Sequence, residues 1–168
     1  ISSGASVTTF SVEQPALAFP SSWPAPADEK AVPEWALGRP LGTYEPGQML
    51  RNIALDYLSV GNEQPKVAVS TSTSMSVKRC VDEGLGFALL PTWCIDESDR
   101  RLSCIALPNA PRIPIYFGEA MFLKSNPFVR SLHKLCLEIF PSTIEERAGR
   151  WNSLDASRPR RARAAARS

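Results

Sequence analysis

Residues 66–91 constrain the fold more than any other stretch, because they form a strand pattern, a helix pattern and a second strand pattern in direct succession. In residues 66–70, Val67 and Val69 fall on one face, at the two-residue spacing of a strand. A short apolar stripe at helical spacing follows, and Gly84 suits the left-handed backbone that ends a helix. Residues 86–90 are an apolar run typical of a buried strand, and Pro91 ends it. This order predicts a right-handed crossover between parallel strands.

The turn between the first strand and the helix of this unit is rich in hydroxyl groups. Ser72 or Thr73 can cap the helix by accepting a hydrogen bond from a backbone N–H group two or three residues further on. A helix start with several hydroxyls also favours small anions. Two interpretations therefore stay open: these residues only cap a helix, or they also bind a ligand.

The segment Cys-Val-Asp-Glu-Gly-Leu-Gly-Phe-Ala-Leu-Leu-Pro, which follows this helix start, resembles the effector-binding domain of LysR-type transcriptional regulators. In that family a helix runs into a Gly-Leu-Gly-aliphatic-Pro segment of the second lobe. Further similarity lies at residues 16–20, 39–44 and 112–140, so the resemblance covers most of residues 15–140. It implies an α/β fold: a type 2 periplasmic-binding-protein-like lobe with a mainly parallel sheet, and a second lobe only partly present.

The resemblance also implies a division of the chain. The strand at Ala16 falls where the family's first hinge crossing lies, and the chain opens at Ile1 without methionine. We therefore expect a fragment that lacks the family's helix-turn-helix and the opening part of the first lobe, with an exposed apolar face where that part would pack. The expected parts are a remnant and hinge strand (1–20), the second effector-binding lobe (21–112), the return strand and C-terminal helix of the first lobe (113–141), and a basic, partly disordered tail (142–168).

By the same resemblance, a small and often carboxylated effector binds between the two lobes, and the full-length protein passes the signal to DNA through its helix-turn-helix. The family works in the cytoplasm, usually as a homodimer or homotetramer, and the resemblance implies no cofactor. The candidate effector contacts come from the hydroxyl-rich turn, from the end of the strand before it and from the hinge crossing: Ser70, Thr71, Ser72, Thr73, Thr43, Tyr44, Phe19 and Pro20. For Thr43 and Tyr44, a plain strand end is an equally good interpretation.

Composition and charge argue against several other functions. The net charge is +2, but five arginines lie within residues 158–167, so the body of the chain is slightly acidic and offers no broad basic surface to nucleic acid. The basic tail can contact phosphates only non-specifically. His133 is the only histidine and the four cysteines form no Cys-x-x-Cys pair, so a metal site is not expected. No apolar run approaches the roughly 20 residues that span a bilayer.

Nothing in the sequence points to an enzyme, since it contains neither a phosphate-binding loop nor a paired acid motif. The main alternative to a regulator is a periplasmic solute-binding protein, although four cysteines without an evident pairing and no visible signal peptide fit a cytoplasmic protein better.

The remaining segments give local expectations. Residues 1–14 show no clear period and are expected to be a frayed remnant. Trp35, Leu37 and Trp93 are expected to pack inward, and His133 to be an ordinary surface residue. Ser142 and Glu145 match a capping box and predict a last short helix through Trp151, whereas residues 157–168 are expected to be disordered.

Overall fold

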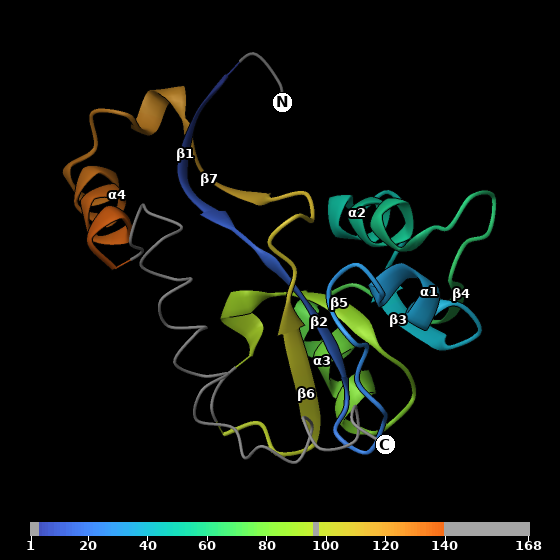
Figure 1. The fold of residues 1–168 in the computed structure, drawn as a ribbon. Coiled ribbons are helices and arrows are strands. Elements are labelled where there is room, and N and C mark those ends of the chain that lie inside the picture. Colours follow the sequence, from blue (N-terminus) through green and yellow to red (C-terminus); the bar gives the residue numbers. More distant parts are fainter. Residues whose placement is uncertain (1–3, 96–97, 140–168) are drawn as a thin grey trace.

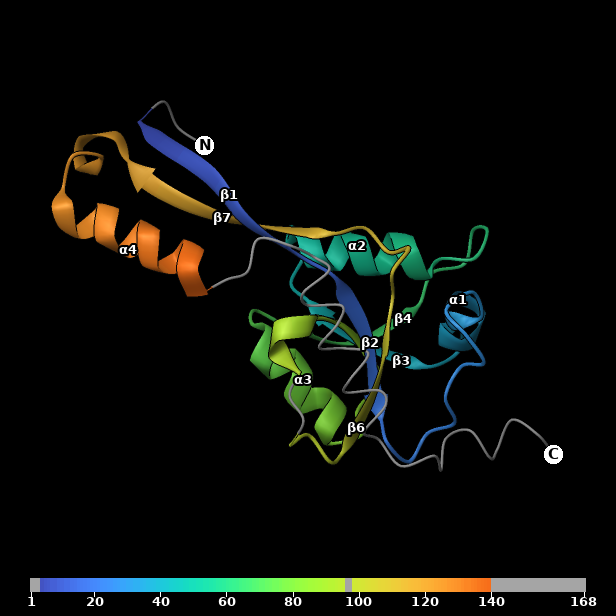
Figure 2. The same ribbon diagram turned by 60° about the vertical axis from the view of Figure 1, so that its left-hand side comes forward.

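The computed structural model describes residues 4–95 and 98–139 (Figures 1 and 2). The elements in chain order are β1 (Ala5–Glu13), β2 (Pro15–Pro20), α1 (Val32–Ala36), β3 (Pro40–Tyr44), α2 (Met49–Leu58), β4 (Lys66–Thr71), α3 (Ser74–Asp82), β5 (Ala88–Pro91), the 3-10 turn η1 (Thr92–Cys94), β6 (Leu102–Ala106), β7 (Ile113–Ala120), the 3-10 turn η2 (Met121–Leu123) and α4 (Pro127–Ile139).

The main lobe is built on a mixed sheet. β3 and β4 pair in parallel, whereas β2 pairs antiparallel with both β5 and β6. A parallel bridge between Leu41 and Phe87 joins the two groups, so the spatial order is β4-β3-β5-β2-β6. Backbone hydrogen bonds from Gly42 N to Phe87 O (2.8 Å) and from Phe87 N to Pro40 O (3.0 Å) hold this join.

The predicted parallel direction of the strands that flank α3 is confirmed, because β4 and β5 both run parallel to β3 and hence to each other. The expected dominance of parallel pairing is wrong. β2 enters the sheet at the edge where the parallel strands end, with Pro15 opposite Pro91, and therefore runs against them. The α/β class holds, but antiparallel strands form one half of the sheet.

Helices cover both faces of this sheet. On one face, Leu41 of β3 shares a core with Ala54 and Leu58 of α2, and on the other, Tyr44 shares a core with Val77 and Val81 of α3. The change of face between Leu41 and Tyr44 follows from the two-residue period of a strand. The α2 core includes an aromatic group in which the Trp35 ring meets the rings of Phe19 (5.4 Å between centroids) and Phe87 (5.3 Å) edge-on.

A long two-stranded ribbon of β1 and β7 projects from the lobe, with α4 beside it (Figure 2). The expectation that residues 1–14 are a frayed remnant is therefore wrong: Ala5–Glu13 is a strand that pairs antiparallel with Ile113–Ala120. The segment is rich in valine and threonine, which favour extended backbone. Its partner lies over 100 residues away in the sequence, and only the fold brings the two strands together.

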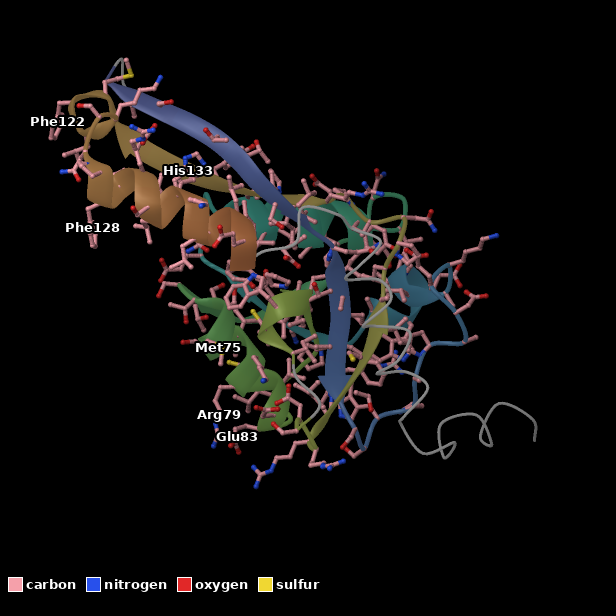
Figure 3. The ribbon with its side chains drawn as sticks, turned by 90° about the vertical axis from the view of Figure 1, so that its left-hand side faces the viewer. Met75, Arg79, Glu83, Phe122, Phe128 and His133 are labelled. Atoms are coloured by element: carbon pink, nitrogen blue, oxygen red, sulfur yellow. The ribbon has the colours of Figure 1, made fainter. Side chains whose placement is uncertain are left out.

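α4 rests on the ribbon through His133, whose ring stacks on that of Phe117 with 4.5 Å between centroids and 5° between planes. His133 is half-buried, so the expectation of an ordinary surface histidine is wrong. The apolar stripe of the helix faces outward instead: Phe128 is 77% exposed and Leu135 is 48% exposed. Figure 3 shows His133 on the side of α4 that faces the ribbon and Phe128 on the opposite side. An apolar face of α4 is thus exposed in the described part of the chain.

Of the three residues expected to pack inward, Trp35 does so, since it is half-buried against the α2 core. Leu37 is half-buried, and Trp93 is 54% exposed, so the expectation for Trp93 is wrong. Val32 and Ala36 are the residues that α1 buries fully. Trp93 lies in η1, where a 3-10 turn points one of three consecutive side chains outward. The predicted helix at residues 142–151 and the tail at 157–168 lie outside the described residues. Across the ranges described, no helix is both long and apolar enough to span a membrane.

Candidate functional site

The parallel strands end at one edge of the sheet. Tyr44, Thr71 and Pro91 are the last residues of β3, β4 and β5, and the register places Tyr44 beside Thr71. In sheets of this kind, ligands bind outside the carboxyl ends of the strands, where the loops into the next helices begin. The hydroxyl-rich turn leads from β4 into α3 at this edge.

The start of α3 is organised by Thr73, as the capping pattern predicts. The Thr73 Oγ1 accepts a hydrogen bond from the backbone N–H of Ser76 (3.2 Å) and also lies 2.9 Å from the Ser76 Oγ. The Thr71 hydroxyl donates to the Thr73 carbonyl (3.3 Å). Ser72, between them, is exposed. The first turn of any helix leaves backbone N–H groups without intrahelical acceptors, so this edge favours negative charge.

Tyr44 links the strand end to the helix start. Its side chain is buried, and its hydroxyl donates to the Ser74 Oγ at 2.9 Å. Burial raises the pKa of Tyr44 to about 12, so the phenol is neutral and remains a donor at physiological pH. Ser74 also forms a hydrogen bond with the Cys94 thiol, whose pKa burial raises to about 11. This Tyr44–Ser74–Cys94 chain fixes the position of the helix start relative to β3 and η1.

Arg51 brings a positive charge to the same edge. Its Nη1 donates to the Tyr44 carbonyl (2.8 Å) and to the Ser70 Oγ (3.0 Å). None of the ion pairs among the described residues involves Arg51, so its charge is not neutralised by a carboxylate there. Nearby, the Gln48 Nε2 donates to the Ser72 carbonyl (3.4 Å).

Arg51 is not among the site residues predicted from the sequence. The sequence does contain one signal: Arg51 lies in the first turn of a helix, where a positive charge interacts unfavourably with the helix dipole, so another interaction must compensate. In the structure, the compensating interactions are its hydrogen bonds to the ends of β3 and β4. The sequence cannot show these bonds, since they depend on how α2 packs over β3 and β4.

Thr43 lies close to the site but on the other face of β3 from Tyr44. Its side chain is 1% exposed, and its Oγ1 has no hydrogen-bond partner among the described residues. A buried hydroxyl without a partner is costly, of the order of 1–3 kcal/mol. Thr43 pairs in register with Ser70, which places it at the same strand ends as Arg51.

Phe19 and Pro20 do not belong to this site, contrary to the expectation. β2 runs opposite to β5, with Pro15 beside Pro91 and Ala18 beside Ala88. The end of β2 therefore lies at the far edge of the sheet, and Phe19 is buried there against Trp35. The start of the strand is the part that reaches the candidate edge.

A buried carboxylate, that of Glu13, lies at the candidate edge of the sheet, next to the start of β2. Glu13, the last residue of β1, is 1% exposed, and its Oε2 accepts a hydrogen bond from the Thr92 hydroxyl at 2.6 Å. This contact ties the end of the ribbon to the turn that follows β5. Glu13 is also not among the predicted site residues, because residues 1–14 were expected to be a frayed remnant.

The site thus combines neutral hydroxyl donors, one guanidinium and a helix start, which together suit recognition of an anion. His133, on α4, is occupied with Phe117 away from this edge. Within the described residues, no three His, Cys, Asp or Glu side chains are grouped so that they could hold a metal ion.

Comparison with known families identifies the fold. Residues 3–136 match the model of the LysR substrate binding domain, so the chain belongs to this family. The family match favours a regulator over a transport protein. No curated protein matches the sequence.

Solved structures agree in fold. The Cbl transcriptional regulator cofactor-binding domain is 17% identical, with a TM-score of 0.70 over 89% of this chain and 65% of that chain. The LysR family transcriptional regulator HinK from Pseudomonas aeruginosa is 15% identical, with a TM-score of 0.65 over 82% of this chain and 50% of that chain. The CcmR regulatory domain of Synechocystis PCC6803, in complex with 2-PG, is 11% identical, with a TM-score of 0.64 over 82% of this chain and 68% of that chain. The chain therefore spans about half the length of HinK.

Proposed function

We propose that this chain is the effector-sensing part of a LysR-type transcriptional regulator, and that a small anion binds at the edge where β3 and β4 end. Arg51 is the observation that carries the proposal. Its guanidinium is held in place by Tyr44 and Ser70, yet no ion pair among the described residues neutralises it. A fixed cation beside a helix start is suited to a carboxylate.

Hydroxyl groups complete the proposed contact surface. Two of the candidate residues, Tyr44 and Ser70, contact the guanidinium. The other candidates belong to the same strand ends and to the turn into α3: Thr43, Thr71, Ser72 and Thr73. A carboxylate pairs with the guanidinium and with backbone N–H groups of α3, and the hydroxyls read the rest of the molecule. The CcmR regulatory domain in complex with 2-PG supports ligand binding by a domain of this fold.

The signal in the proposed mechanism is a shift between arrangements of two lobes. An effector changes this equilibrium only by the difference between its affinities for the two arrangements. Glu13 and Thr92 hold the junction between ribbon and lobe, so a change at the edge of the sheet reaches the ribbon directly. We further propose that the full protein acts on DNA through a helix-turn-helix, as a cytoplasmic homodimer or homotetramer.

The test is a titration of the 168-residue chain with a panel of mono- and dicarboxylates, read by thermal shift and then by calorimetry on any hit. Charge-assisted hydrogen bonds contribute about 1.5–3 kcal/mol, so Arg51→Gln should weaken binding roughly 10- to 100-fold.

Arg79→Gln is the matched control, because Arg79 is an exposed arginine of α3 that pairs with Glu83. Its substitution should leave affinity unchanged. Equal losses in the two variants, or a hit whose affinity ignores Arg51→Gln, would contradict the proposed site.

A further inference from the structure

Thr43 carries a buried hydroxyl whose hydrogen-bonding capacity is unused. Its side chain is 1% exposed, and its Oγ1 has no hydrogen-bond partner among the described residues. A buried polar group without a partner lowers stability, and valine, which has nearly the same shape, would avoid this loss. A threonine at this position therefore points to a use other than stability.

Thr43 lies beside the proposed anion site and on the same face of the sheet. It pairs in register with Ser70, and side chains that pair across two strands share a face. Arg51 reaches this face from α2. Its Nη1 donates to the Ser70 Oγ (3.0 Å) and to the carbonyl of Tyr44, the residue that follows Thr43 (2.8 Å). The guanidinium thus bridges the two strand ends at the level of Thr43.

The Arg51 guanidinium has donors to spare. Both N–H groups of Nη1 are used by the two bonds to the strand ends, whereas those of Nε and Nη2 have no acceptor in the described part of the chain. A carboxylate pairs with two such N–H groups at once, through two parallel hydrogen bonds. The site therefore offers a bidentate partner to a carboxylate, next to a threonine hydroxyl that lacks an acceptor.

We propose that Thr43 is a specificity-determining residue of this site, and that the effector is a carboxylate with a hydroxyl group on the neighbouring carbon. This assignment rests on the function proposed above. In the bound state the guanidinium turns outward to the carboxylate, and the effector hydroxyl takes the place of Nη1 at the strand ends. There it accepts a hydrogen bond from the Thr43 hydroxyl and donates one to the Tyr44 carbonyl, which Nη1 has left.

The hydrogen bonds at the strand ends distinguish three classes of carboxylate. Only a hydroxyl both accepts and donates, so a 2-hydroxy acid satisfies Thr43 and the Tyr44 carbonyl together. A 2-oxo acid satisfies Thr43 alone, and an acid with a plain methylene group satisfies neither. Each missing hydrogen bond weakens binding about tenfold. The predicted order of affinity is therefore 2-hydroxy acid, 2-oxo acid, unsubstituted acid.

The experiment is calorimetry on the 168-residue chain with 2-hydroxybutyrate, 2-oxobutyrate and butyrate, which differ only at the second carbon. Wild type should bind the hydroxy acid roughly 100-fold more tightly than butyrate, with the oxo acid between them. Malate and succinate repeat the comparison with a second carboxylate present.

Three variants assign the preference to the Thr43 hydroxyl. Thr43→Val keeps the shape of the side chain, so it should weaken binding of the hydroxy acid about tenfold and leave butyrate unaffected. Thr43→Ser keeps the hydroxyl and should retain the order of affinities. Thr8→Val makes the matched substitution at an exposed threonine of β1 and should change none of them.

Unfolding in urea gives a second measurement, which needs no ligand. Thr43→Val removes an unpaired hydroxyl from the free chain, so the urea midpoint should rise, whereas Thr8→Val should leave it nearly unchanged. A lower midpoint for Thr43→Val would show that the hydroxyl is already hydrogen-bonded in the free chain, which would overturn the assignment.

The results also separate the role of Thr43 from the anion site itself. If none of the acids binds, or if Arg51→Gln leaves their affinities unchanged, the anion site is wrong and the role of Thr43 is lost with it. If the acids bind through Arg51 but the hydroxy acid is not preferred, or is still preferred by Thr43→Val, the anion site stands and Thr43 does not determine its specificity.

Discussion

Gly86→Ala should destabilise the chain through a single contact at the join of the sheet. A Cβ at this position would lie 2.4 Å from the Pro40 carbonyl oxygen and 3.1 Å from the Pro40 carbonyl carbon. Both are backbone atoms of β3, so no side chain can rotate out of the way. Relief requires β3 and β5 to separate, and these strands are joined beside the glycine by hydrogen bonds between Phe87 and its two partners on β3, Pro40 O and Gly42 N.

The expected loss has two parts. Overpacking a tight site costs about 1–3 kcal/mol, and weakening two backbone hydrogen bonds adds about 1 kcal/mol in all. We therefore expect Gly86→Ala to lower the free energy of unfolding by about 3 kcal/mol. This is a large part of the ~5–15 kcal/mol that a domain usually has.

Urea unfolding followed by circular dichroism gives the free energy, with two glycines as controls. Gly118→Ala adds a Cβ in open space at an ordinary φ and should change stability by less than about 0.5 kcal/mol. Gly84→Ala has space but sits at φ +74°, so it should cost about 1 kcal/mol through the backbone alone. If Gly86→Ala lowers the free energy of unfolding no more than Gly84→Ala does, the close approach of β3 to β5 is not what requires glycine at position 86.

The remaining predictions concern charges around α3. Lys78 and Asp99 form a largely buried ion pair (2.7 Å), so Asp99→Asn should leave a buried cation and lower the free energy of unfolding in urea by about 3 kcal/mol. Glu83→Gln breaks the exposed pair with Arg79 and should cost under about 1 kcal/mol. Equal losses in the two variants would contradict the role of burial. Burial, and then the charge of Asp99, raise the pKa of Asp82 above its usual 3.8. The folded state therefore holds this proton more tightly than the unfolded state does. Its free energy of unfolding falls as the pH rises from about 3.8 through the raised pKa. Asp82→Asn should therefore raise the urea midpoint at pH 7, by a margin that shrinks as the pH falls below about 4; a margin constant with pH would show that the carboxyl does not titrate differently on folding.

Short-range signals in the sequence predicted the local structure well. Thr73 caps α3, and Gly84 lies at positive φ just after it ends. Each of these features depends on residues a few positions apart. The family resemblance, carried by the glycine and proline pattern after α3, gave the fold class.

Contacts between residues far apart in the chain could not be predicted from the sequence. The partner of β1 lies over 100 residues away, and without it the segment shows no strong period. Because β2 runs antiparallel to β5, Phe19 lies at the edge of the sheet opposite the candidate site. No residue pattern within β2 predicts the direction in which the strand runs. Arg51 became part of the site only through the packing of α2 over two strand ends.

The two connections between the ribbon and the lobe are mechanically unequal. A single residue, Gln14, separates β1 from β2, whereas the connection from β6 to β7 is longer and is anchored by Glu29, whose carboxylate accepts from the Asn109 N (2.9 Å) and Nδ2 (2.7 Å). The same carboxylate accepts from the Tyr57 hydroxyl of α2 (3.0 Å). The short connection is nevertheless held firmly, because Thr92 donates through its backbone N–H to the Gln14 carbonyl (3.3 Å) and through its hydroxyl to Glu13 (2.6 Å). Any turning of the ribbon against the lobe must therefore break the Thr92 contacts at one connection or the Glu29 contacts at the other.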